Sequence, residues 1–228
     1  MRRILAELTG TFCLVFVATA VVVVDTQTAG VVGHVGIALA TGLIVMVMIY
    51  TIGELSGAHI NPAVTLGFWL AGRFSTQQVI PYILAQVGGA ILASLLVLAL
   101  FRPVSDLGRT LPAGSWQQSL ILEVVLTAIL MLVILRVSRG SKETGIMAGA
   151  AIGSVVALAV LFAGPVSGAS MNPARSLAPA VVGLDTSFLW IYLVAPPVGA
   201  ALAVVLDQCL GSPLDPASRV DGKEPEIR

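Results

Sequence analysis

Six stretches of this chain are apolar over nearly their whole length, and each is long enough to cross a membrane. They run roughly over Ile4–Val24, Val35–Ile52, Val79–Phe101, Ser119–Leu135, Ile146–Phe162 and Phe188–Leu206. A helix needs ~20 largely apolar residues to cross ~30 Å of hydrocarbon. Charged residues make up only 11% of the chain and the mean hydropathy is +0.99, whereas a soluble domain usually carries about 25% charged residues. The sequence therefore predicts an all-α membrane protein with six transmembrane helices.

Two further apolar segments are too short to span. One follows Asn61 and runs to about Ala71, and the other follows Asn172 and runs to about Val182. Roughly ten helical residues at ~1.5 Å each reach ~15 Å, which is half the bilayer core. We expect both segments to be re-entrant half-helices.

The chain repeats itself around these two segments. Residues 56–63 (Ser-Gly-Ala-His-Ile-Asn-Pro-Ala) match residues 167–174 (Ser-Gly-Ala-Ser-Met-Asn-Pro-Ala), and the offset between the Asn residues is 172 − 61 = 111. Earlier in each half, Glu7 recurs as Glu123 at an offset of 123 − 7 = 116. Each copy holds two spans, a half-helix and one span. Because three spans is an odd number, the second copy must be inverted, and the half-helices should meet near the midplane from opposite sides.

The six spans and the internal repeat predict one channel domain over residues 1–210. Repeat one covers about 4–101, and repeat two covers about 119–210. The tail 211–228 holds three Pro and seven charged residues, so we expect it to be disordered. Met1-Arg2-Arg3 before an apolar run also fits a signal peptide, but Glu7 interrupts that run early and no small-residue cleavage site is evident. We interpret it as the start of the first span.

The Lys and Arg residues are divided unequally between the two sides of the predicted bundle. The side with both termini has nine: Arg2, Arg3, Arg73, Arg136, Arg139, Lys142, Arg219, Lys223 and Arg228. The other side has three: Arg102, Arg109 and Arg175. Since cytoplasmic loops carry an excess of Lys and Arg, we expect cytoplasmic termini in a plasma or bacterial inner membrane. The net charge is zero and no basic tract is present, so no nucleic-acid partner is expected.

At the two repeated motifs the chain resembles the aquaporin, or major intrinsic protein, family, and the resemblance covers about residues 4–210. The second motif, residues 164–177 (Gly-Pro-Val-Ser-Gly-Ala-Ser-Met-Asn-Pro-Ala-Arg-Ser-Leu), is most similar to the nodulin-like branch of plants and its bacterial relatives. The resemblance implies an aquaporin-like fold, a passive channel for small uncharged solutes, and a homotetramer.

Each Asn-Pro-Ala motif also has a direct physical interpretation. The motifs are Asn61-Pro62-Ala63 and Asn172-Pro173-Ala174. Asn is a strong N-cap, and Pro at the first helical position gives up only an N–H that the helix does not use. The Asn oxygen should accept from its own helix, which leaves the NH₂ as a donor for the oxygen of a passing solute. The small Ala side chains should let the two helix ends touch.

By the resemblance, the selectivity filter is formed by Thr41, Val160, Ala169 and Arg175, found by counting from the two Asn residues. Strict water channels have Phe and His at the first two positions, and glycerol channels have two aromatic residues. Here none of the positions is aromatic, so we expect a wider opening. It should pass water, glycerol-sized polyols and neutral metalloid acids such as boric or arsenous acid, and exclude protons and ions. A mainly water-selective channel is the alternative.

Several other residues receive predicted roles. Glu7 and Glu123 are intramembrane carboxylates that either brace the nearby loops or serve as a proton relay, and bracing is favoured. The main-chain carbonyls of Gly57, Ala58, His59, Gly168, Ala169 and Ser170 should form acceptor positions along the pore. We expect Arg73 and His34 to be interfacial. Cys13 and Cys209 should be small core residues without a disulfide.

Other classes of protein fit less well. No His, Cys and carboxylate spacing suggests a metal site, and two histidines do not supply a Ser-His-Asp set. We therefore expect no enzyme activity, metal or cofactor. A coupled secondary transporter would need a titratable group beside the central motifs, where only His59 and Arg175 are available. A structural junction protein has little support from the short loop Asp25–His34.

Overall fold

The computed structural model describes residues 1–102, 106–139 and 145–211. Their helices are α1 (Arg2–Gln27), α2 (Gly33–Ser56), α3 (Pro62–Leu70), α4 (Thr76–Leu100), α5 (Trp116–Val137), α7 (Ala148–Ser167), α8 (Pro173–Val182) and α9 (Leu189–Cys209). Among these described residues, six helices are long and apolar enough to cross a membrane, and only α3 and α8 are short. The predicted fold class is confirmed. The predicted disorder of residues 212–228 lies outside the described residues.

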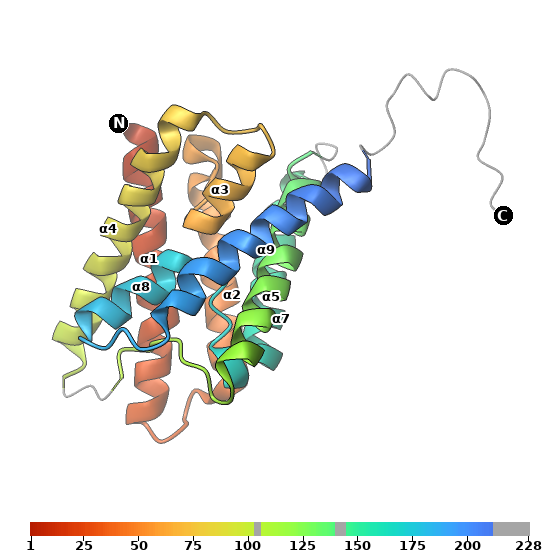
Figure 1. The fold of residues 1–228 in the computed structure, drawn as a ribbon. Helices are drawn as coiled ribbons and strands as arrows, with labels where there is room; N and C mark the ends of the chain where they lie inside the picture. Colours follow the sequence, from red (N-terminus) through yellow and green to blue (C-terminus); the bar gives the residue numbers. More distant parts are fainter. Residues whose placement is uncertain (103–105, 140–144, 212–228) are drawn as a thin grey trace, which may run out of the picture.

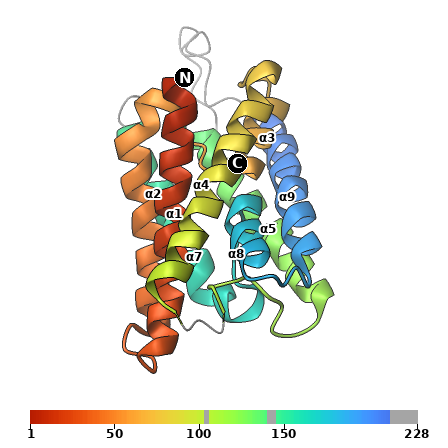
Figure 2. The same cartoon turned by 90° about the vertical axis from the view of Figure 1, so that its left-hand side faces the viewer.

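The two repeats form two matching half-bundles. In the first, α1 packs on α2 and α4; in the second, α5 packs on α7 and α9. The halves join where α2 packs on α7. Each half-helix then crosses to the other repeat, because α3 packs on α9 and α8 packs on α4. Figures 1 and 2 show α3 in the upper half of the bundle, at the end that carries the N-terminus, and α8 in the lower half. This arrangement places the two half-helices end to end.

Two equivalent glycines set the closest helix contacts. A Cβ on Gly89 would lie 2.2 Å from the main-chain oxygen of Leu8, and a Cβ on Gly199 would lie 2.3 Å from that of Val124. Any larger residue would therefore force α4 away from α1, or α9 away from α5. These contacts lie within one chain, so both glycines serve the packing of the bundle itself.

The outer face of the bundle is apolar. Large side chains such as Leu39, Leu84, Ile121 and Leu202 remain about half exposed or more. Exposed apolar surface on this scale is characteristic of a chain that contacts lipid rather than water. The interior, by contrast, holds fully buried carboxylates and hydroxyls among the apolar core residues, and these polar groups belong to the site described below.

The predicted ends of the spans differ from the observed ends by a few residues. The largest difference is in α7, which continues past Phe162 to Ser167. Pro165 lies in this extension and lacks the N–H that would bond the carbonyl of Leu161, four residues earlier. His34 supplies the missing partner, with Nε2 2.7 Å from the oxygen of Leu161. His34 lies near the start of α2 and is partly exposed, as expected of an interfacial residue, and in addition it has this specific partner on α7.

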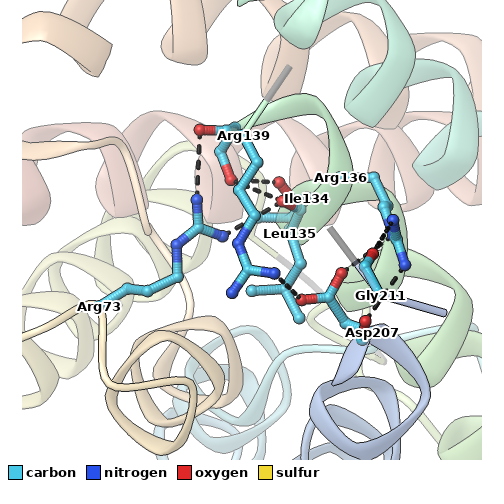
Figure 3. A network of polar contacts seen from close by, with 8 residues as sticks. Arg73, Ile134, Leu135, Arg136, Arg139, Asp207 and Gly211 are labelled. Atoms are coloured by element: carbon cyan, nitrogen blue, oxygen red, sulfur yellow. Dashed lines mark hydrogen bonds and ion pairs between the residues drawn. The ribbon is translucent and has the colours of Figure 1, made fainter. Parts of the chain in front are cut away.

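A buried carboxylate joins the ends of α5 and α9 (Figure 3). Asp207 is 1% exposed. One oxygen of Asp207 lies 2.9 Å from Nε of Arg136, and the other lies 2.7 Å from Nη1 of Arg139. Arg136 also donates to the main-chain oxygens of Asp207 and Gly211, at 3.2 and 2.9 Å. The last turn of α9 is thus tied to the last turn of α5.

Arg73 lies in the same region and has specific hydrogen-bond partners there. Its guanidinium donates to the carbonyls of Leu135 and Ser138, each at 3.2 Å (Figure 3). The guanidinium carbon also lies over the ring of Phe68, 5.6 Å from the ring centre. The last carbonyls of a helix lack partners within the helix. Arg73 satisfies two of them, and so fixes the far end of α3 to the end of α5.

The expectation for the cysteines is wrong for one of them. Cys209 is the last residue of α9 and is exposed, although Asp207 in the same helical turn is buried. Cys13 is half-buried, and both thiols are free.

Candidate functional site: the transmembrane cavity

A cavity of about 520 Å³ runs through the bundle between α1, α2, α5 and α7. Asp25 and His34 lie at one end of it, and Val137 and Ala148 lie at the other. The remaining wall is formed by the two loops that lead into α3 and α8, by parts of these half-helices, and by Gly108 and Arg109. The cavity therefore extends between the two ends of the membrane-spanning helices.

The two loops have an unusual backbone. Four non-glycine residues have positive φ: Ala58 (46°), Ile60 (42°), Ala169 (44°) and Met171 (53°). For a β-branched residue such as Ile60 this conformation is a true outlier. Such strain persists only when the surroundings over-determine it.

Glu7 and Glu123 supply that constraint. The two oxygens of Glu7 accept from the main-chain N–H groups of His59 and Ile60, at 2.9 and 2.7 Å. Those of Glu123 accept from Ser170 and Met171, at 2.8 and 2.7 Å. Both carboxylates are fully buried. Every oxygen is committed to a loop N–H, which is the geometry of a brace and not of a proton relay facing the cavity.

Asn61 and Asn172 occupy the N-caps of the half-helices. Oδ1 of Asn61 accepts from the N–H of Ala63, and Oδ1 of Asn172 accepts from those of Ala174 and Arg175. Both residues also line the cavity. Behind them, Ala63 and Ala174 are completely buried, and Pro62 and Pro173 begin α3 and α8.

The amide nitrogens bond across the repeat. Nδ2 of Asn61 donates to the oxygen of Met171 at 2.8 Å, and Nδ2 of Asn172 donates to the oxygen of Ile60 at 3.0 Å. The sequence prediction left the NH₂ of each Asn as a donor for the oxygen of a passing solute and did not include a bond between the two loops. One hydrogen is instead used to lock the two loops together, so each Asn offers a solute only its second N–H.

The residues predicted to supply carbonyls lie on the cavity wall. Gly57, Ala58, His59, Gly168, Ala169 and Ser170 all line it. The two glycines have no side chain, so they contribute main-chain atoms alone. The His59 ring packs against Phe68, Phe74 and Tyr82, and its Nδ1 lies 3.1 Å from Oγ1 of Thr65.

All four predicted filter residues line the same cavity. They are Thr41, Val160, Ala169 and Arg175. The Thr41 hydroxyl donates to the carbonyl of Ile37 at 2.8 Å, so toward the cavity it offers an acceptor. Val160 and Ala169 present apolar surface. Arg175 is 8% exposed and is the sole charged member of the set.

Arg175 is held by a residue that sequence reasoning missed. Its Nη1 donates to the carbonyl of Gly108 at 2.7 Å. Gly108 has φ of +67°, and a Cβ there would lie 2.9 Å from main-chain atoms of Thr19 on α1. The next residue but one, Thr110, donates to Oγ of Ser176 at 2.7 Å. A glycine two positions after Asp106 and directly before Arg109, in a connecting segment, was the sequence signal for this contact.

An ion-pair cluster lies next to this contact. Nε of Arg109 is 3.3 Å from Oδ1 of Asp106, and its Nη1 pairs with Oδ2 of Asp185. The hydrogen bond that Arg109 donates to the Asp185 carboxylate raises the pKa of Arg109. Hydrogen bonds from Ser187 and Arg109 hold the pKa of Asp185 below its usual range. Both groups are therefore charged at neutral pH.

Comparison with known proteins gives consistent matches over nearly the whole chain. The family model described as major intrinsic protein matches residues 1–206. "Aquaporin NIP1-4" of Oryza sativa subsp. japonica is 46% identical over 205 residues, which cover 88% of this chain and 74% of the relative. "Probable aquaporin NIP4-2" of Arabidopsis thaliana is 46% identical over 200 residues, covering 87% and 70%. The X-ray structure of the aquaglyceroporin from Plasmodium falciparum superposes with a TM-score of 0.82 at 27% identity, covering 92% of this chain and 96% of that one.

Proposed function

The chain belongs to the major intrinsic protein family, and we propose that it conducts water, glycerol-sized polyols and neutral metalloid acids such as boric or arsenous acid down their gradients. It is a multi-pass membrane channel and not an enzyme. Two relatives named above are NIP aquaporins by name, and the structural relative is an aquaglyceroporin.

The chemistry of the four cavity-lining filter residues carries this proposal. None of them is aromatic, so no large ring narrows the opening at these positions. Arg175 offers a planar fork of donors, and Thr41 offers an acceptor. Val160 and Ala169 supply apolar surface. A small molecule with hydroxyl groups on a compact centre matches this combination of partners.

We propose that the same cavity excludes protons and cations. The N-termini of α3 and α8 lie beside the cavity at Asn61 and Asn172, and each carries roughly half an elementary positive charge. Arg175 adds a full positive charge. A cation would also lose hydration water that these donors do not replace.

We further propose the assembly and orientation. Residues 1–210 should form a single channel domain that assembles as a homotetramer in a plasma or bacterial inner membrane, with cytoplasmic termini. Each subunit should contain its own pore, because both half-helices belong to one chain. A monomeric mass in mild detergent with full transport retained would contradict the tetramer.

Purified protein in liposomes tests the solutes directly. Swelling or shrinkage should be followed by light scattering after separate gradients of sorbitol, glycerol, urea, boric acid and arsenous acid, with empty liposomes as the control. We expect water, glycerol and both metalloid acids to pass. Water passage alone would establish the water-selective alternative. Transport that collapses when the proton gradient or membrane potential is abolished would indicate a coupled transporter instead.

A further inference from the structure

The width of the proposed filter depends on where the guanidinium of Arg175 lies, and Arg175 donates to the carbonyl of Gly108 at 2.7 Å. We propose that Arg109, through its ion pairs with Asp106 and Asp185, is a positioning residue that determines solute selectivity by holding the Gly108 carbonyl against Arg175. This inference rests on the proposed function, because it concerns the filter of that channel.

The segment 106–110 contacts α8 and its following loop at three separate points. Gly108 accepts from Arg175, Thr110 donates to Ser176, and Arg109 pairs with Asp185. The first two points lie in the first turn of α8, and the third lies beyond its far end. The segment therefore lies along the length of the half-helix, from the filter to the surface.

Arg109 is central to this contact. Its own main-chain N–H donates to Oδ1 of Asp106 at 2.9 Å, and its Nη1 also donates to the main-chain oxygen of Asp185 at 3.3 Å. Its side chain is 14% exposed, whereas those of both aspartates are over 40% exposed. It also lines the mouth of the cavity. Arg109 thus connects two loops beside the filter without facing lipid.

Because Arg175 donates to Gly108, the position of its guanidinium depends on the ion pairs of the neighbouring Arg109. Gly108 lies against α1 on one side, and the adjacent Arg109 holds it to the loop after α8 on the other. The carbonyl of Gly108 draws the guanidinium of Arg175 toward the wall. If segment 106–110 is released, the guanidinium loses this partner and extends into the cavity. The permeability to wide solutes such as glycerol then falls more than the permeability to water.

The test compares three variants with wild type in the liposome assay. Arg109→Gln removes the ion pairs with both Asp106 and Asp185. Asp185→Asn removes only the second ion pair and leaves Arg109 in place. Arg109→Lys keeps a positive charge at this position. We expect the ratio of glycerol to water permeability to fall by about threefold or more in the first two, because a hydrogen bond to a charged group shifts an equilibrium by about tenfold. Arg109→Lys should recover part of the ratio.

Arg139→Gln is the matched control. It removes an ion pair with Asp207 at 2.7 Å, at the opposite end of the bundle from the filter, and should leave the ratio at its wild-type value. Permeabilities are normalised to inserted protein, and thermal unfolding reports whether each variant is folded. If Arg109→Gln does not fold, Asp185→Asn decides the outcome, since Asp185 is on the surface.

The results separate this inference from the proposed function. If wild-type protein passes neither glycerol nor a metalloid acid, the proposed solutes are wrong. If wild type passes glycerol but the folded Arg109 and Asp185 variants keep its ratio, the inference is overturned. The inference is also overturned if glycerol and water permeability fall equally, because that result shows only a structural role.

Discussion

His34 donates a hydrogen bond to the main-chain carbonyl of Leu161, the carbonyl that Pro165 leaves without a partner in α7. Nε2 of His34 lies 2.7 Å from the main-chain oxygen of Leu161, and Pro165 lacks the N–H that would otherwise occupy this oxygen. Because a carbonyl only accepts, Nε2 must carry the proton. His34 therefore ties α2 to α7 at the mouth of the cavity.

Replacing this histidine should destabilise the channel. In His34→Leu the Leu161 carbonyl loses this donor, and the net loss of one hydrogen bond costs about 0.5–1.5 kcal/mol. His34→Gln places an amide nitrogen near the same position and should be milder. Thermal unfolding of the purified channel in detergent measures both. Equal midpoints for wild type and His34→Leu would show that water replaces the bond at no cost.

Narrowing the filter should separate water from larger solutes. Thr41→Phe with Val160→His adds two rings to the cavity wall on α2 and α7. We expect glycerol and boric acid permeability to be suppressed and water permeability to be largely retained. Light-scattering measurements on liposomes compare the solutes. Leu39→Phe is the control, because it adds a ring on the outer face of α2, where Leu39 is 52% exposed. It should change neither the glycerol and boric acid permeability nor the water permeability.

Removing the filter charge should weaken the exclusion of charged species. Arg175→Val deletes the positive charge and leaves a small apolar wall, so the barrier to cations falls. We expect higher proton and sodium leakage than in wild-type liposomes, measured with a pH-sensitive dye inside the vesicle and with sodium flux. The deletion also leaves the Gly108 carbonyl unpaired, so folded protein must be quantified. Leakage equal to that of wild type would mean that the half-helix termini suffice.

The buried carboxylates should be more important for stability than for chemistry. In Glu123→Gln one oxygen is replaced by an NH₂ that cannot accept from a loop N–H, and an unpaired buried donor costs about 1–3 kcal/mol. Glu7→Gln should lose a similar amount, since Glu7 binds the equivalent pair of N–H groups. Thermal unfolding measures the loss. If either variant kept wild-type stability but lost transport, a relay role would have to be reconsidered.

Much of the fold follows from local features of the chain. Apolar length separates spans from half-helices, because the bilayer thickness is fixed, and the repeat with an odd number of spans requires inversion. The caps at Asn61 and Asn172 follow from residue chemistry next to Pro. The filter residues were placed by family resemblance alone, and their role in selectivity stays a prediction that the transport experiments must test.

The sequence by itself determined which residues lie in the membrane and that a helix begins at each of the two motifs. Both properties depend on residues that are neighbours along the chain. Only the tertiary structure decided which residues distant in the sequence form hydrogen bonds with one another. It showed Asn61 bonded to Met171, Arg73 bonded to the end of α5, and Arg175 held by Gly108. These bonds join residues more than 60 positions apart. Their geometry depends on how the two half-bundles pack, and no local pattern encodes that.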